Sequence, residues 1–234
     1  MKMKVVTCWD DAPVNDIRLV DIFRRHGAKA TFNLNPGLMH PELRGTNRWL
    51  APGEHLRCYN GFIPAKLSQK DVAEIYEGFE LASHCWQHEL PGQCPDTEWI
   101  RSALDARHFC EDVMQRPCLG FAWPCGISTP STIALLREHG FAYGRTTNNA
   151  ADVTDCAEPL ALSSNCHFMA RDFWDRYEAA RKTGVFYFWG HSYELYEYDP
   201  LWRQLENKIA EISADPDAEW ANVIDIVPLL RKKS

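Results

Sequence analysis

Short apolar runs alternate with longer amphipathic stretches along most of the chain. Each run is rich in β-branched or aromatic residues and is bounded by glycine, proline, asparagine or aspartate, as buried strands commonly are. The stretches between them have apolar positions at helical spacing. The predicted strands are Lys4–Trp9, Ala30–Asn35, Phe79–Ser83, Leu119–Trp123, Phe141–Thr147 and Val185–Gly190, and the predicted helices are Asn15–His26, Ser68–Tyr76, Asp96–Arg116, Pro130–His139, Asp172–Thr183 and Pro200–Ser213.

This alternation predicts parallel strands joined by helical crossovers, and therefore an α/β fold with an open sheet or a barrel. Asn15 and Ser68 stand where helix N-caps are expected, and Gly27 and Gly140 follow predicted helix ends. No G-x-G-x-x-G pattern follows the first strand. A dinucleotide-binding sheet therefore lacks its main signal.

One stretch, Leu38–Lys66, is polar, rich in proline and glycine, and has no clear period. We expect a long loop or insertion there, which could form part of a site wall. No linker interrupts the pattern elsewhere. The whole chain, residues 1–234, is therefore interpreted as one domain.

Composition narrows the possible partners. The net charge is −7 and no block of five basic residues occurs, so a nucleic-acid partner is not expected. No apolar run is long enough for a membrane helix. The N-terminus lacks the pattern of a signal peptide, which favours a cytoplasmic protein. Nine cysteines without a C-x-x-C pair indicate reduced thiols rather than a disulfide framework.

Two adjacent carboxylates, Asp10 and Asp11, end the first predicted strand. They repel each other unless a cation or a proton intervenes. On its own, this pair is more typical of a solvated strand-to-helix turn.

Two histidines, His84 and His88, follow the third predicted strand. A His-x3-His spacing can direct two imidazoles at one metal ion, although two unrelated histidines would give the same pattern. Both this pair and the carboxylate pair stand at predicted C-terminal strand ends, where α/β barrels place their active sites. One carboxylate and two imidazoles leave an open coordination position, as in catalytic metal sites.

Several segments resemble the motifs of the polysaccharide-deacetylase (NodB-homology) family, in the family's order from Val5 to about Ser192. The first is similar to that family's Thr-Phe-Asp-Asp-Gly-Pro motif, and the others resemble its second strand, its His-x3-His loop, its third motif and its late histidine. These segments are Thr7-Cys8-Trp9-Asp10-Asp11-Ala12-Pro13, Gly27–Asn35, Phe79–His88, Gly120-Phe121-Ala122-Trp123-Pro124-Cys125-Gly126 and Gly190-His191.

The resemblance implies a distorted parallel (β/α) barrel of seven to eight strands and a divalent metal. Zinc is the usual ion, and cobalt, nickel, iron or manganese are alternatives. Asp11, His84 and His88 align with the family's metal ligands, Asp10 with its general base and His191 with its general acid. These roles suit amide hydrolysis, because a metal activates water, a carboxylate removes a proton, and a histidine can protonate the leaving nitrogen.

The third motif supplies further candidates. The family stabilises the oxyanion with a backbone N–H that corresponds here to Cys125, and Gly126 would allow the turn that presents it. Trp123, Trp86 and Trp189 could all be core residues. We expect that one of the three forms a stacking surface for a sugar ring.

The sequence departs from the family in three places. Ala122 replaces the arginine that steers the base, and we hypothesise that Arg145 reaches across from the next strand to Asp10; a surface arginine is the alternative. Cys85 stands where serine or threonine is usual and is not expected to bind the metal. The fourth motif has no clean match, although His167 could orient His191 or line the pocket.

The leading interpretation is removal of an acetyl group from an N-acetylated mono- or oligosaccharide. The same site would serve a non-sugar C–N bond, such as a formamide or a ureide. A catalytically inactive carbohydrate-binding homologue is a further alternative, but such a protein is expected to lose Asp10 or His191, and both are present. The oligomeric state cannot be read from the pattern.

Overall fold

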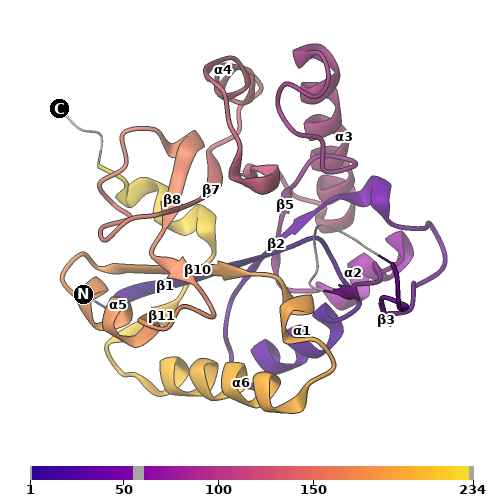
Figure 1. Cartoon of the computed structure of the whole chain (residues 1–234). Helices are drawn as coiled ribbons and strands as arrows, with labels where there is room; N and C mark the ends of the chain where they lie inside the picture. Colours follow the sequence, from indigo (N-terminus) through magenta and orange to yellow (C-terminus); the bar gives the residue numbers. More distant parts are fainter. Residues whose placement is uncertain (1, 55–60, 232–234) are drawn as a thin grey trace.

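The computed structural model of the chain describes residues 2–54 and 61–231, and it is built around one curled sheet (Figure 1). Within these residues the strand order is β8-β7-β6-β5-β2-β1-β10-β9, with β11 paired to the start of β1, and every pairing in this sheet is parallel. The strands are β1 (Met3–Asp10), β2 (Thr31–Leu34), β5 (Glu80–Ser83), β6 (Gly120–Ala122), β7 (Tyr143–Asn149), β8 (Leu162–Ser164), β9 (Cys166–His167), β10 (Val185–Gly190) and β11 (Ala218–Trp220).

The two ends of this strand order are consecutive parts of one segment, because only Asn165 separates β8 from β9. The backbone N–H of Asn165 donates to the carbonyl of Tyr187 on β10 at 2.7 Å. The Tyr187 N–H donates in turn to the side-chain oxygen of Asn165, also at 2.7 Å. The sheet therefore curls until its ends meet, as the predicted distorted barrel requires.

Side chains alternate between the inside of the barrel and the outer layer of helices. On β1, Val6 and Cys8 pack with Tyr187 in an inner apolar cluster. Val5 and Trp9 instead join an outer cluster that includes residues of α1. Because successive side chains of a strand point to opposite faces, only every second polar residue near a strand end points into the barrel.

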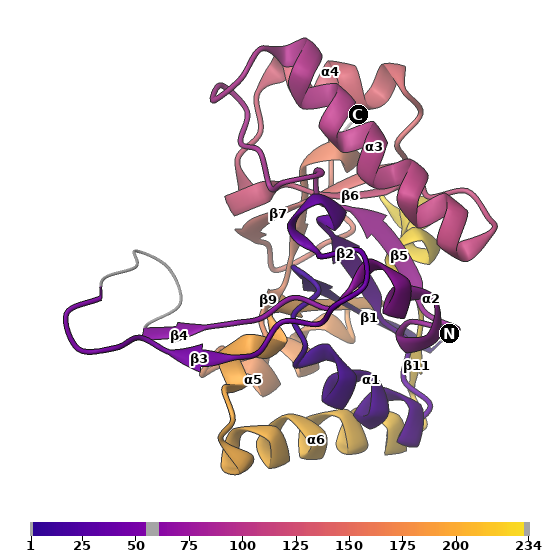
Figure 2. The same cartoon turned by 90° about the vertical axis from the view of Figure 1, so that its right-hand side faces the viewer.

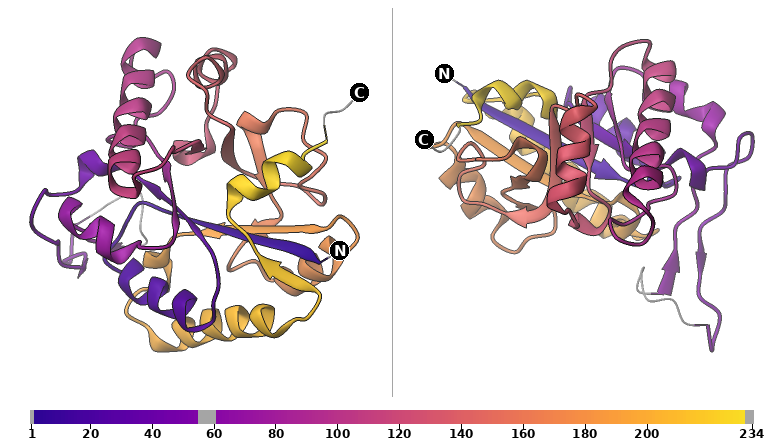
Figure 3. Two further views of the ribbon diagram at one scale, coloured as in Figure 1. Left: turned by 180° about the vertical axis from the view of Figure 1, so that it is seen from behind. Right: turned by 90° about the horizontal axis from the view of Figure 1, so that it is seen from above.

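The helices cover the outside of the sheet (Figures 1 and 3). Most lie close to their predicted positions, and Gly27 and Gly140 have the positive φ expected after helix ends (+62° and +75°). The helices are α1 (Asp16–Arg25), α2 (Val72–Ile75), α3 (Asp96–Met114), α4 (Pro130–Glu138), α5 (Phe173–Ala180) and α6 (Asp199–Ala214).

Three local predictions hold only in part. The helix expected over Ser68–Tyr76 is a 3-10 turn, Gln69–Asp71, followed by the single turn of α2. Asn15 and Ser68 do stand at the N-cap positions of α1 and of the 3-10 turn, but neither makes a side-chain capping bond. Ser68 donates instead to the Asp71 carboxylate. Asn15 bonds to a distant segment, the carbonyl of Tyr196. A local contact of Ser68 and a tertiary contact of Asn15 have thus taken the polar groups that a cap would use.

The segment Leu38–Lys66 contains an antiparallel pair, β3 (Arg48–Trp49) and β4 (Phe62–Ile63). Its residues 55–60 lie outside the described part of the chain. Figures 2 and 3 show that this segment, here called the arm, extends well away from the barrel. Its base pairs with the loop that follows β1, since Pro13 and Lys66 form an antiparallel bridge.

None of the helices in residues 2–54 and 61–231 combines the length and the apolar character needed to cross a bilayer.

Candidate active site

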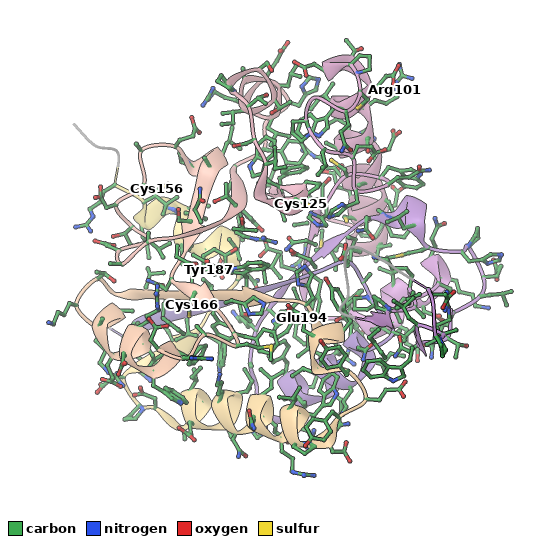
Figure 4. All side chains as sticks on the ribbon, viewed as in Figure 1. Arg101, Cys125, Cys156, Cys166, Tyr187 and Glu194 are labelled. Atoms are coloured by element: carbon green, nitrogen blue, oxygen red, sulfur yellow. The ribbon has the colours of Figure 1, made fainter. Side chains whose placement is uncertain are left out.

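A cavity of about 220 Å³ opens where the parallel strands end. Its walls come from the loops after β1, β5 and β6, from the upper part of β7, and from β10 with its following turn. In the view of Figure 4, Cys125 and Glu194 lie on different sides of the middle of the barrel, while Arg101 on α3 is at the outer edge. The lining residues are Asp10, Asp11, His84, His88, Trp123, Cys125, Arg145, Thr147, Trp189, His191 and Tyr193.

Asp11, His84 and His88 converge in this cavity, with one potential ligand atom from each lying within 4.8 Å of the others. The His84 Nδ1 atom is 2.8 Å from the carbonyl oxygen of Ala122, which fixes the proton on Nδ1 and leaves Nε2 as an electron-pair donor. Burial lowers the pKa of His84 to about 4. The ring is therefore neutral at ordinary pH, as metal ligation requires.

Asp11 is held by two residues that approach it from different segments. The side-chain amide of Asn35 donates to Oδ1 at 2.6 Å, and Lys66 Nζ of the arm lies 3.5 Å from the same oxygen. Burial alone would raise the pKa of Asp11, but the charge of Lys66 and the neighbouring histidines hold it well below its ordinary range. The Asp11 carboxylate therefore stays anionic at neutral pH and well below it.

Asp10 lies beside this group and has its own set of donors. Arg145 Nη2 donates to both carboxylate oxygens, at 2.5 Å to Oδ1, and the Asn33 side-chain amide donates to Oδ1 at 2.6 Å. Burial pushes the pKa of Asp10 upward, yet the Arg145 guanidinium and the nearby histidines outweigh it and keep the pKa below its usual value. The hypothesis that Arg145 reaches Asp10 agrees with this geometry.

His191 also approaches Asp10, with Nε2 3.8 Å from Asp10 Oδ2. Its Nδ1 atom is 3.2 Å from Glu194 Oε2, the oxygen that also accepts from the His191 backbone N–H at 3.0 Å. Burial would lower the pKa of His191, but the bond to Glu194 and the charge of Asp10 raise it above its ordinary value. The imidazole therefore keeps its proton to a higher pH than an unperturbed histidine does.

His167 does not line the cavity and reaches His191 only through Glu194. Its Nε2 atom lies 2.9 Å from Glu194 Oε2, and its Nδ1 accepts from the Met169 backbone N–H at 3.3 Å. The Nε2 atom is therefore the one that carries the proton. One carboxylate oxygen thus serves two histidines.

The loops of the site have unusual backbone conformations. Seven non-glycine residues among those described have positive φ, and five of them belong to the loops that line the cavity: Asp11, Ala12, Cys85, His88 and Cys125. Such conformations persist only where surrounding contacts enforce them, and they concentrate at functional sites. Gly190, just before His191, fits closely because an added Cβ would lie 2.1 Å from the Phe168 ring.

Of the three tryptophans considered for a stacking surface, Trp123 does not offer one. Its ring is fully buried, stacks on Trp99 at 5.3 Å and 9°, and donates from Nε1 to the Leu160 carbonyl at 2.7 Å. Trp123 is therefore a core residue that borders the cavity without exposing a ring face to solvent. Trp189 is half-buried and lines the cavity, and the Arg145 guanidinium lies 4.8 Å above its ring.

The remaining candidates of the third motif differ in position. Cys125 lines the cavity, is exposed, and has a φ of 53°. Gly126 follows at φ +71°, as expected for a turn that presents a backbone N–H. Trp86 packs against Phe109 of α3 and takes no part in the lining. Cys85 is buried in the cluster around Trp99, away from the ligand group.

Sequence reasoning missed four polar residues that hold the site: Asn33, Asn35, Lys66 and Glu194. A signal for two of them existed, since Asn33 and Asn35 are spaced by two within a predicted strand and so share one face. Glu194 stands three residues after His191, a spacing at which side chains meet in a helical turn. Lys66 belongs to an irregular segment and had no comparable signal.

A family model described as polysaccharide deacetylase matches residues 1–144. No curated protein matches the chain significantly.

Several solved structures are similar over almost the whole chain. A protein from Mycobacterium smegmatis, provisionally described as a polysaccharide deacetylase, is 18% identical with a TM-score of 0.64, covering 98% of this chain and 91% of that one. A family 4 acetyl xylan esterase from Clostridium thermocellum in complex with a cobalt ion is 15% identical with a TM-score of 0.56, covering 97% and 91%. The peptidoglycan deacetylase PdaC from Bacillus subtilis is 13% identical, with the same TM-score and coverage.

The match to a Streptococcus pyogenes deacetylase is partial and spans 55% of that chain's length. The full-length likenesses confirm the parallel (β/α) barrel that the motifs imply. At these identities they bear on the fold alone.

Proposed function

Because the chain belongs to the polysaccharide deacetylase family, we propose that it is a metal-dependent hydrolase that removes the acetyl group from an N-acetylated amino sugar. One observation carries the proposal. Three potential ligand atoms converge within 4.8 Å next to a carboxylate, Asp10, that has its own guanidinium partner. A separate imidazole, His191, lies 3.8 Å from the same carboxylate.

The donor set of Asp11, His84 and His88 suits a divalent cation of the zinc, cobalt or nickel type. Two imidazole nitrogens and one carboxylate oxygen are ligands that such ions accept, and three protein ligands leave room for water and substrate. The bond from His84 to the Ala122 carbonyl orients the ring as second-shell contacts do in metal sites. When bound there, the cation would polarise the amide carbonyl and make a coordinated water more acidic.

Asp10 is assigned the role of general base. Arg145 and Asn33 fix its carboxylate and keep it ionised, so it can accept a proton from the attacking water. Since the family's own arginine is replaced by Ala122, Arg145 supplies the charge from a strand across the barrel. Its long, planar fork can hold a carboxylate from that distance.

His191 is assigned the role of general acid. An amide nitrogen leaves readily only after it is protonated, and the raised pKa of His191 keeps a proton available. Glu194 positions the ring through Nδ1, which leaves Nε2 facing the cavity. His167 positions Glu194 in turn. This carboxylate takes the place of the aspartate that the family's fourth motif would supply.

The backbone N–H of Cys125 is assigned to the oxyanion, since its turn lies on the cavity wall. Donors placed in advance of the reaction stabilise the charge that develops on the carbonyl oxygen. Trp189, with its half-buried ring on the same cavity, replaces Trp123 as the candidate for contact with a sugar face.

The test is acetate release from N-acetylglucosamine oligomers by the purified protein, with zinc or cobalt and with a chelator. We expect turnover with metal, loss on chelation, and recovery when the metal is restored. Formamide and ureide substrates, assayed in parallel, distinguish the alternative C–N hydrolase. Metal-independent turnover, or turnover confined to non-sugar amides, would refute the proposal.

A further inference from the structure

The arm is bonded at its base to the loop that carries the candidate metal ligand Asp11. The Val14 N–H donates to the Ala65 carbonyl at 2.9 Å, and the Leu67 N–H donates to the Ala12 carbonyl at 3.0 Å. Ala12 directly follows Asp11 in the chain. The arm therefore starts at the rim of the active-site cavity and extends outward from it (Figures 2 and 3).

A chain of side-chain amides fixes the arm against the turn that follows His191. The amide of Asn47, on the arm, donates to the side-chain oxygen of Asn15 at 3.0 Å and accepts from the Ala65 N–H at 2.9 Å. Asn15 Nδ2 lies 3.4 Å from the carbonyl of Tyr196, which also accepts from Trp202 Nε1 at 3.0 Å. These bonds hold the described part of the arm in a defined place.

Three aromatic rings meet where the arm faces this turn. Trp49 stacks on Tyr196 with centroids 5.5 Å apart and planes at 21°. Phe62 meets both rings edge-on, at 5.1 and 5.5 Å. Phe62 is only 1% exposed, whereas Trp49 is 57% exposed. Phe62 is thus the support of the cluster, and Trp49 is the ring that it presents to solvent.

This cluster continues the aromatic wall of the cavity. Tyr193 lines the cavity and packs against His191 with ring centroids 4.8 Å apart. The Tyr196 N–H donates to the Tyr193 carbonyl at 2.9 Å, which closes the last turn of the 3-10 helix Ser192–Leu195. One short turn of chain therefore carries both the cavity-lining Tyr193 and the Tyr196 ring of the cluster.

We propose that Trp49, Tyr196 and Tyr193 form a platform that binds the sugar units next to the one being deacetylated. The inference rests on the proposed function and narrows its substrate class to neutral oligo- or polysaccharide chains rather than single N-acetyl sugars. Flat apolar rings match the C–H faces of pyranose rings, and rings that are fixed in advance lose little freedom on binding. The net charge of −7 disfavours a strongly anionic chain.

The experiment measures binding and turnover of N-acetylglucosamine and of its tetramer. Binding is measured by calorimetry in the Asp10→Asn background, and turnover is measured in the protein with Asp10 intact. Trp49→Ala is expected to weaken tetramer binding about tenfold and to lower the tetramer-to-monomer ratio of kcat/KM by the same factor, because it removes one aromatic contact. Trp49→Phe is expected to restore most of the loss.

Leu43→Ala is the matched control, since Leu43 is on the same arm, is 65% exposed, and lies outside the aromatic cluster. It is expected to leave both quantities unchanged. Equal tetramer affinities in the Trp49→Ala and Leu43→Ala proteins, or an Asp10→Asn parent protein that binds the tetramer no tighter than the monomer, would overturn the platform. So would a dimer in light scattering that Trp49→Ala dissociates, because the ring would then contact a second copy of the chain.

The two proposals fail separately. If the protein releases no acetate from any substrate but tetramer binding depends on Trp49, the proposed reaction is wrong and the platform stands. If acetate release is normal and Trp49→Ala leaves the tetramer-to-monomer ratio of kcat/KM unchanged, the proposed reaction stands and the platform is wrong.

Discussion

Arg145 on β7 and Asp10 on β1 form an ion pair across the inside of the barrel, with Nη2 2.5 Å from Oδ1. The side chains are 1% and 3% exposed. Two strands that are not neighbours in the sheet are thereby linked through the floor of the candidate active site. The positive charge that the family's arginine would supply from the position of Ala122 comes here from Arg145 on the next strand. A barrel permits this exchange because side chains from every strand meet in its centre.

Breaking this pair on one side is expected to destabilise the protein strongly. Arg145→Met leaves the buried Asp10 charge without its partner, at a cost of about 3–5 kcal/mol in the free energy of unfolding. Adding Asp10→Asn to Arg145→Met removes the unpaired charge and should recover much of the loss. Urea unfolding at a fixed metal concentration measures both. A double variant no more stable than Arg145→Met would contradict the account.

The second prediction concerns pH dependence and Glu194. The charge of Glu194 helps to raise the pKa of His191, so Glu194→Gln lowers that pKa and the ring loses its proton at a lower pH. The alkaline limb of the kcat/KM profile should therefore move to lower pH, while His191→Ala should lower the rate by about 10²–10⁴-fold. Glu197→Gln, an exposed glutamate in the same segment, is the control. An unmoved alkaline limb in Glu194→Gln would show that this carboxylate does not set the pKa of the acid.

The third prediction concerns stability rather than activity. Glu80, at the start of β5 and far from the cavity lining, accepts a 2.5 Å bond from Thr31 Oγ1, and burial raises its pKa to about 7. Unfolded glutamate titrates near 4.3, so between these values the folded protein holds a proton that the unfolded chain has lost. The retained proton of Glu80 therefore contributes to the free energy of unfolding. This contribution is fully present below about pH 4 and is lost as the pH rises towards 7, with the free energy of unfolding falling by up to about 1.4 kcal/mol per pH unit.

Glu80→Gln removes that titration. The difference in unfolding free energy between the variant and the wild type should shift in favour of the variant from pH 5 to pH 7, and then stay level. Chemical unfolding at several pH values measures the difference, with the exposed Glu77→Gln as the control. Parallel stability curves for Glu80→Gln and wild type would show that Glu80 is ionised in the folded protein across this range.

Much of the fold was predictable because the barrel strands are buried on both faces and read as apolar runs. The strand predicted over Lys4–Trp9 is β1, Met3–Asp10, and Val185–Gly190 is β10 without change. The strands β8, β9 and β11 have only two or three residues each, which is too short for a period to be visible. The closure of the barrel at Asn165 depends on long-range pairing and left no local pattern.

The site was predictable where chemistry and strand ends coincide, as at Asp11, His84 and His88. Which side chains support them depends on the register between strands. From the sequence alone, Arg145 could point into the barrel or out of it, because the sequence does not show which alternate residues of β7 face inward. In the structure Arg145 faces inward, as does Tyr143 two residues earlier. Trp123 misled because an aromatic residue in a site motif can equally belong to the core. Its partner Trp99 comes from a helix far away in the sequence.

Metal content and acetate release, measured together in wild type, Asp10→Asn and His88→Ala, test the central claim most directly. The account predicts about one equivalent of zinc or cobalt in wild type and in Asp10→Asn, and loss of most of it in His88→Ala, which lacks one of three ligands. Acetate release should be confined to wild type, with Asp10→Asn reduced by at least about 10²-fold. An Asp10→Asn protein that turns over near the wild-type rate, or a His88→Ala protein that keeps both its metal and its activity, would contradict it.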